Sequence, residues 1–152
     1  DGIKPDGSFQ DAGMNSFNHY AYGAIGEWMY RVVAGVEIDE AHPGYKHILI
    51  QPQPGGGLTF ANASVESMYG RVASGWKITE GKLTVNVEVP PNTTATVRLP
   101  KAKLEQATEG QKPLTNRADL LGAHQAADAV LVEVGSGQYV FESGFAGTTP
   151  GP

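Results

Sequence analysis

The pattern of hydrophobic and polar residues changes once along the chain, near Gly35. Before Gly35, apolar and small residues recur with the period of an α-helix, about 100° per residue. One stripe of this helix carries Phe17, Ala21, Ala24, Ile25, Trp28 and Val32, and the opposite stripe carries His19, Gly23, Gly26 and Tyr30. After Gly35, short runs rich in Val and Thr alternate with turn residues. The pattern predicts one helix over residues 15–34, followed by a chain that is mainly β.

The predicted helix has almost no polar face. Between residues 14 and 36 the only charged residues are Glu27 and Arg31, spaced i,i+4 as a local ion pair. A surface helix would carry charge along one side. Gly23 and Gly26 each lower the stability of the helix by roughly 1 kcal/mol relative to alanine. We therefore expect their benefit to be room for a neighbouring backbone or a ligand. The helix should therefore be enclosed by something else, with His19 in the cleared space.

The ends of the helix and the strands after it can be placed from turn and capping residues. Asn15 or Ser16 is the expected N-cap, and Gly35 the expected C-terminal cap. The predicted strands cover residues 45–50, 58–67, 71–78, 83–89, 94–99, 130–134 and 138–142. Their short length and spacing predict an antiparallel β-sandwich, and Glu80-Gly81 is a plausible hairpin turn.

Two later segments have weaker patterns. Residues 101–129 are polar and only loosely periodic, and we expect a short strand at Leu104 and a helical turn near Leu120. Residues 144–152 consist mainly of Gly, Thr and Pro and are expected to form a flexible tail.

Composition and charge exclude several classes of partner. The 152 residues carry 11 basic and 16 acidic residues, a net charge of -5, with no basic stripe that could neutralise phosphates. Nucleic acid is therefore not an expected partner. No apolar run is long enough to span a bilayer, so no membrane association is expected. The absence of cysteine excludes disulfides and thiolate metal sites. The sequence assigns no cellular compartment.

Four blocks of sequence resemble a known family. They are NSFNHYAYGAIGEWMYRVVAG, PGYKHILIQPQPGGGL, YGRVASGWK and VPPNTTATVRLP. They are similar to the C-terminal part of bacterial α-L-rhamnosidases, a family of glycoside hydrolases with an (α/α)6 barrel followed by a β-sandwich of jelly-roll type. The resemblance implies that residues 1–38 end the barrel, 39–143 form the sandwich and 144–152 form the tail. A helix in such a double ring is covered on both sides, as the pattern requires.

The resemblance also implies a reaction. Members of the family hydrolyse terminal α-L-rhamnose with inversion, using a general acid and a general base whose carboxyl groups are roughly 6.5 to 9.5 Å apart. The general acid of the family lies far upstream, and Asp1-Gly2 matches the end of the run that carries the base. We therefore expect no catalytic residue in this chain and no activity of the chain alone. The implied partners are the rest of the catalytic domain and a rhamnose-containing glycoside or polysaccharide, and no cofactor or metal is implied.

His19 is the one position to which the resemblance carries a functional role. The family has a sugar-contacting histidine in the matching Asn-His-Tyr block, and a neutral imidazole can both donate to and accept from sugar hydroxyls. The alternative is a buried histidine bonded to a barrel carbonyl. Tyr20, Tyr22 and Trp28 are expected to pack rather than to bind sugar.

Other candidate sites are weaker. Asp1, Asp6 and Asp11 lie in a glycine-rich loop that could suggest calcium, but the EF-hand pattern is absent, so turn formation is the preferred interpretation. The other three histidines have no metal-ligand spacing and are expected to pack or face solvent: His42, His47 and His124.

Two roles remain open for the β part. It could be a carbohydrate-binding module that offers exposed aromatic side chains, for which the candidates are Phe60, Tyr69, Trp76 and Tyr139. For Trp76, core burial is the preferred interpretation because it lies in a strand with alternate burial. The second role, which we rank first, is to support the barrel. That role predicts an exposed apolar surface on this chain where the barrel would lie.

Overall fold

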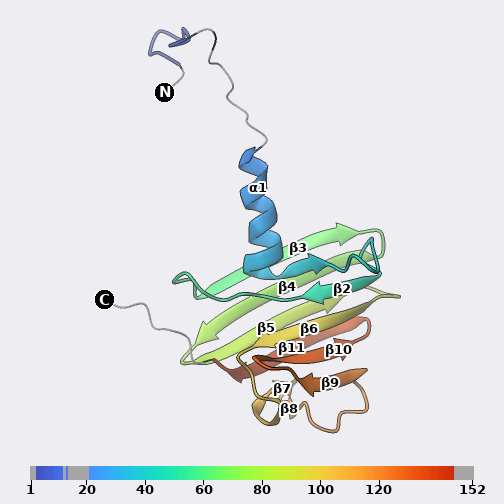
Figure 1. The fold of residues 1–152 in the computed structure, drawn as a ribbon. Helices are drawn as coiled ribbons and strands as arrows, with labels where there is room; N and C mark the ends of the chain where they lie inside the picture. Colours follow the sequence, from blue (N-terminus) through green and yellow to red (C-terminus); the bar gives the residue numbers. More distant parts are fainter. Residues whose placement is uncertain (1–2, 12, 14–20, 146–152) are drawn as a thin grey trace.

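The computed structural model describes residues 3–11, 13 and 21–145 of the chain. One helix leads into two β-sheets that pack face to face (Figure 1). The prediction of a mainly β chain with one preceding helix is therefore confirmed.

The helix ends where the sequence predicts. Helix α1 (Ala21–Trp28) continues directly into the π-helix η1 (Met29–Ala34). Gly35 follows with a positive φ of 82°, and its N–H donates to the carbonyl of Tyr30. A Cβ at Gly35 would lie 2.2 Å from the backbone nitrogen of Pro52, so backbone conformation and space both require glycine here. The predicted N-cap, Asn15 or Ser16, lies outside the described residues.

The first sheet has the strand order β1-β2-β6-β10-β9. Its strands are β1 (Val36–Ile38), β2 (His47–Ile50), β6 (Thr94–Pro100), β9 (Gly122–Gln125) and β10 (Ala129–Val134). Strands β2 and β6 pair in parallel, and the other described pairs of this sheet are antiparallel.

The second sheet has the strand order β3-β4-β5-β11-β7-β8, and all its described pairs are antiparallel. Its strands are β3 (Phe60–Ser67), β4 (Gly70–Thr79), β5 (Lys82–Val89), β7 (Thr108–Glu109), β8 (Lys112–Pro113) and β11 (Gly137–Gly144). The hairpin between β4 and β5 turns at Glu80 and Gly81, whose φ angles of 51° and 74° are both positive, as in a type I′ turn. The predicted hairpin is confirmed.

The buried hydrophobic residues that the structure describes form one core between the sheets. Strand β5 shows how the sequence builds it, because Leu83, Val85, Val87 and Val89 are buried while the residues between them face outward. The core also holds the end of the helix. The indole N–H of Trp76 donates to the carbonyl oxygen of Val33 at 2.7 Å, and the hydroxyl of Ser74 donates to that of Ala34 at 2.6 Å.

Two expectations for residues 101–129 were wrong. Leu104 begins a short 3-10 helix, η2 (Leu104–Gln106), instead of lying in a strand, because its N–H is bonded by the side-chain oxygen of Gln125 and not by a strand neighbour. Residues 118–121 form turns and bends without a helical turn, and Leu120 is buried in the core. Hydrogen bonds from side chains across the loop determine the conformation of this segment. The hydrophobic periodicity of the sequence does not reveal such bonds.

Candidate functional site

The helix exposes most of its apolar residues in the described part of the chain. Ile25, Trp28 and Met29 are 59%, 51% and 54% exposed. A Cβ placed at Gly23 or Gly26 would meet nothing within 4 Å apart from the helix's own nearby backbone. The room predicted beside these glycines is therefore open, and the sandwich does not enclose the helix.

Within the described residues, polar groups join the helix to the sandwich at its last turn. The predicted ion pair between Arg31 and Glu27 is present at 2.8 Å, and Arg31 makes a second one with Glu37 of β1, also at 2.8 Å. The hydrogen bond to Glu37 raises the pKa of Arg31 above its ordinary value, and the hydrogen bond to Glu27 raises it further. His19, the predicted sugar contact, lies outside the described residues.

The carboxylates of the sandwich are scattered and paired. Four surface hollows in the described region each contain a single carboxylate, which is Glu88, Glu142 or Asp128. Each carboxylate forms an ion pair: Arg71–Glu88 at 2.7 Å, Lys82–Glu142 at 2.9 Å and Arg98–Asp128 at 2.6 Å. None of these hollows brings together the two carboxyl groups that acid–base hydrolysis of a glycoside requires.

The aromatic residues of the sandwich are mostly unavailable as platforms for sugar rings. Trp76 is buried, as predicted. Tyr139 stacks on Phe141 with ring centroids 5.9 Å apart and donates its hydroxyl to the carbonyl of Gly135, and burial raises its pKa. Tyr69 is partly buried, with the Lys46 ammonium 5.2 Å from its ring centre. Among the four candidates, Phe60 alone is largely exposed.

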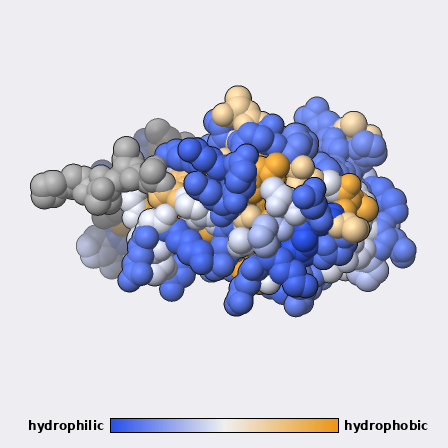
Figure 2. All heavy atoms as spheres, turned by 90° about the horizontal axis from the view of Figure 1, so that it is seen from below, coloured by the Kyte–Doolittle hydropathy of each residue, from blue (hydrophilic) through white to orange (hydrophobic). Residues whose placement is uncertain are grey.

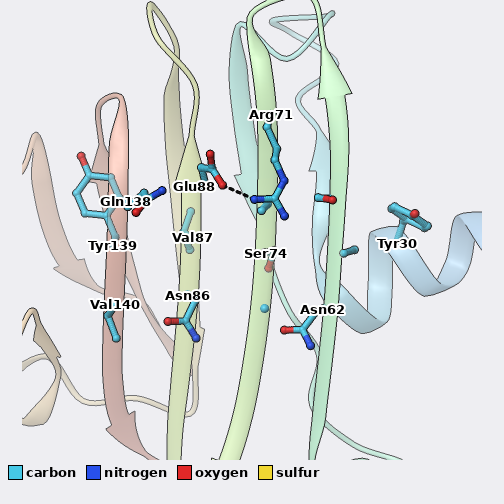
Figure 3. Close-up of a pocket in the computed structure, with 14 residues that line it drawn as sticks. Tyr30, Asn62, Arg71, Ser74, Asn86, Val87, Glu88, Gln138, Tyr139 and Val140 are labelled. Carbon is cyan, nitrogen blue, oxygen red and sulfur yellow. Dashed lines mark hydrogen bonds and ion pairs between the residues drawn. The ribbon is translucent and has the colours of Figure 1, made fainter.

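The largest of the four hollows lies on the outer face of the second sheet (Figure 3). It has a volume of about 500 Å³ and crosses strands β3, β4, β5 and β11. Three exposed amide side chains line it, those of Asn62, Asn86 and Gln138. The sequence analysis missed these residues, although their outward positions in alternating strands could have identified them.

The aspartates and histidines form local structure in the described region. Asp6 accepts bonds from the backbone and the hydroxyl of Ser8 at 2.9 and 2.7 Å, which lower the pKa of Asp6. The preferred interpretation of a turn fits this geometry. His42 contacts Asp39, and the ring nitrogens of His47 lie 2.7 and 2.8 Å from the hydroxyls of Thr94 and Thr96, whereas His124 is exposed. The described residues contain no group of three or more candidate metal ligands.

Arg117 anchors the long loop between β8 and β9. Its guanidinium bonds Glu109 at 2.8 Å and Asp119 at 2.6 Å, and its side chain is only 12% exposed. The bond from Arg117 lowers the pKa of Asp119 to about 2. This cluster holds the loop against β7, so it is structural and not part of the hollow.

Two models of known domains match the chain on either side of Gly35. A model of the C-terminal domain of bacterial α-L-rhamnosidases matches residues 35–113, and a model of the six-hairpin glycosidase domain of the same enzymes matches residues 3–33. The chain belongs to the bacterial α-L-rhamnosidase family. The resemblance found in the sequence is confirmed, and the two matches meet where the helix ends and the sandwich begins.

Individual α-L-rhamnosidases are similar to nearly the whole chain. The α-L-rhamnosidase of Streptomyces avermitilis is 40% identical over 141 residues, which are 93% of this chain and 13% of that protein. A crystal structure of the S. avermitilis α-L-rhamnosidase with L-rhamnose superposes with a TM-score of 0.75 and 38% identity, over 93% of this chain and 13% of that one. The α-L-rhamnosidase from Dictyoglumus thermophilum has a TM-score of 0.77 and 31% identity, over 90% and 15% of the two chains. The chain thus corresponds to a small part of each relative.

None of the helices in the described region has the length and apolar content needed to cross a membrane.

Proposed function

We propose that this chain is the C-terminal region of an enzyme that releases terminal α-L-rhamnose by an inverting mechanism, and that its sandwich mainly supports the catalytic barrel. The observation that carries the proposal is the helix. It belongs to the segment that matches the glycosidase domain, yet Ile25, Trp28 and Met29 are exposed in this chain.

The contacts of the helix favour a supporting role for the sandwich. Ile25, Trp28 and Met29 offer apolar side chains to a neighbour, while the last turn of the helix accepts hydrogen bonds from buried Trp76 and Ser74. A barrel packed on the exposed side would therefore be held to the sandwich through a rigid, buried junction. Figure 2 looks at the molecule from the end away from the helix, where hydrophilic residues predominate among the described ones.

The substrate we propose is a rhamnose-containing glycoside or polysaccharide, with His19 contacting the sugar. Both catalytic carboxylates would lie upstream of this chain, so the chain alone would be inactive. This agrees with the solitary, ion-paired carboxylates in the four hollows.

The division of the chain into 1–38, 39–143 and 144–152 stays a prediction. Strand β1 pairs with β2 of the sandwich, and Phe145 is buried, with its N–H donating to the carbonyl of Gly81. Both observations favour a sandwich that extends somewhat beyond 39–143 at each end. Residues 146–152 of the expected tail lie outside the described residues.

The alternative role, a carbohydrate-binding module that uses exposed aromatic rings, has less support. Three of its four candidate rings are buried or half-buried. Phe60 by itself does not form an extended platform.

The test of the reaction compares hydrolysis of an aryl α-L-rhamnoside by this chain and by the longer polypeptide whose C-terminal part it would form. We expect turnover only in the longer polypeptide, with NMR detecting the inverted anomer as the first product. His19→Ala in the longer polypeptide should lower kcat/KM without unfolding the protein. Turnover by the purified chain alone, or a retained anomer, would contradict the proposal.

The test of the supporting role places a charge on the exposed helix of the longer polypeptide. Ile25→Lys should lower both its melting temperature and its activity, because the charge would be buried against the barrel. Leu121→Lys is the matched control, since Leu121 is 67% exposed and lies beside β9. Equal effects of the two variants would show that the helix face is not a barrel contact.

A further inference from the structure

The hollow on the second sheet has a floor of small residues and polar walls. The cross-strand pairs place Ala73 between Ser64 and Glu88, and Gly75 between Asn62 and Asn86. Ala73 and Gly75 of the central strand β4 leave a shallow depression, while the longer side chains stand on the neighbouring strands. Figure 3 shows the amides of Asn62 and Asn86 on either side of β4.

Gly75 makes room at the centre of this depression for the amide of Asn62. A Cβ at Gly75 would lie 2.4 Å from the side-chain oxygen of Asn62 and at ordinary distance from everything else near it. The φ angle of Gly75 is not in the left-handed region, so backbone conformation does not require glycine. The residue therefore provides space above the strand, and the amide of Asn62 lies across that space.

The amides that line the hollow are available to a ligand. The side chains of Asn62, Asn86 and Gln138 make no hydrogen bond to any other described residue. Each amide offers a carbonyl acceptor and two N–H donors. Together they present several donors and acceptors along one open surface.

The charge of the hollow indicates which class of ligand fits. Its two charged residues, Arg71 and Glu88, form an ion pair at 2.7 Å at one end, so the lining carries no net charge. An anionic ligand such as nucleic acid would find no unpaired cation there, and a lipid chain would leave the three amides without hydrogen-bond partners. A peptide strand would pair with the edge of a sheet, whereas this hollow lies on its face. A neutral molecule with many hydroxyl groups matches amide donors and acceptors, and a volume of about 500 Å³ is that of a ligand site.

We propose that this hollow binds a neutral saccharide, in particular the part of a rhamnosylated glycan beyond the sugar that is cleaved. Tyr30 of η1 also lines the hollow, and it belongs to the segment that matches the glycosidase domain. A glycan held here would therefore run beside the junction between sandwich and barrel. The choice of a rhamnosylated glycan rests on the proposed function, whereas the binding of a neutral saccharide does not.

The test measures binding to this 152-residue chain by NMR titration, after its dispersed spectrum has shown it to be folded. The two probes are a neutral oligosaccharide with a terminal α-L-rhamnose and cellotetraose, which lacks rhamnose. We expect saturable binding of the rhamnosylated probe, with shifts in the amide side-chain signals of Asn62, Asn86 and Gln138. Asn86→Ala should weaken binding about fivefold, and Asn86→Ala with Gln138→Ala more than tenfold.

Two further variants keep the result interpretable. Gly75→Ala should weaken binding by moving the amide of Asn62, and only the end of a flexible side chain must shift, so the fold should be kept. Thr84→Ala is the matched control, because Thr84 lies two residues before Asn86 on the same face of β5 but does not line the hollow. It should leave binding unchanged.

The outcomes separate this proposal from the proposed function. Binding of either probe that falls in the amide variants supports the saccharide site, and binding of cellotetraose alone would remove its link to rhamnose. Absence of saturable binding of both probes, or binding that none of the hollow variants changes, would overturn the proposal. Hydrolysis of the aryl rhamnoside by the longer polypeptide would stand in either case, and its absence would not affect a measured saccharide site.

Discussion

The two tryptophans of this chain lie in regions with opposite relations to water. Trp76 of β4 is 1% exposed and bonded to a backbone carbonyl, whereas Trp28 at the end of α1 is 51% exposed. The sandwich buries most of its apolar residues between two sheets, and the described part of the helix leaves most of its apolar residues uncovered. The comparison teaches that apolar content alone does not identify a core: most apolar residues of the sandwich are buried within this chain, whereas those of the described helix are mostly exposed.

The difference between the regions also explains how they are joined. In the described part of the chain, the helix is joined to the sandwich through η1, where Val33 and Ala34 are buried and their carbonyls accept hydrogen bonds from Trp76 and Ser74. Buried polar groups that keep their partners contribute to stability and fix a single geometry. The orientation of the helix is therefore set by the sandwich core and not by its exposed length.

The strongest test of this difference replaces each tryptophan with alanine. Trp76→Ala should lower the free energy of unfolding of the chain by about 3 to 5 kcal/mol, because it opens a cavity and leaves the carbonyl of Val33 without its donor. Trp28→Ala should change it by less than about 0.5 kcal/mol. Urea denaturation followed by circular dichroism measures both.

Trp76→Phe is the control for the tryptophan pair. It keeps an aromatic ring in the core and removes the indole N–H. It should therefore lower the free energy of unfolding by less than Trp76→Ala does. A loss at Trp28 as large as that at Trp76 would mean that the helix packs on the sandwich in solution, and the contrast between the two regions would fail.

A second substitution acts at the junction itself. Gly35→Ala should destabilise the chain by roughly 3 kcal/mol, since a Cβ here combines left-handed backbone strain with overlap against the backbone of Pro52. Gly44→Ala is the matched control, because Gly44 also has a positive φ, of 76°, but has open space around it. Similar losses in both variants, measured by thermal denaturation, would show that only backbone strain matters at Gly35.

Most of the sandwich could be predicted because buried apolar residues and outward-facing residues alternate along its strands. Leu83, Val85, Val87 and Val89 are spaced two apart, and such spacing leaves one arrangement in which all four are buried. The turn at Glu80-Gly81 and the cap at Gly35 were predictable for a related reason, since both depend on a positive φ that few residues tolerate. The hydrophobic pattern predicted that the helix needs a cover, and only the resemblance to the family implied that a barrel provides it.

The loop from 101 to 129 and the hollow could not be predicted in the same way. The conformation at Leu104 depends on Gln125, and that of the loop before β9 depends on Arg117 with Glu109, through contacts between residues distant in sequence. The hollow depends on the register that places Gly75 between Asn62 and Asn86. Neither a period nor a local motif carries information of this kind.

The smallest expected effect concerns the polar anchors of the two regions. Arg117 in the sandwich loop has a side chain 12% exposed, and Arg31 at the end of the helix has one 45% exposed. Arg117 lowers the pKa of Asp119 from 3.8 to about 2. Because the pKa is lower in the folded state, this carboxylate stabilises the fold above about pH 4, and the contribution is lost as the pH falls towards about 2.

Asp119→Asn should therefore destabilise the chain slightly near neutral pH, and the difference from the wild type should vanish by about pH 2. NMR titration of the Asp119 carboxyl carbon gives the pKa directly, and urea denaturation at several pH values gives the stability. Glu27→Gln removes an exposed partner of Arg31 and should cost less than about 0.5 kcal/mol, because surface ion pairs are weak. A pKa of Asp119 near 3.8 would mean that the Arg117 anchor does not form in solution, and the contrast between the anchors at Arg117 and Arg31 would then fail.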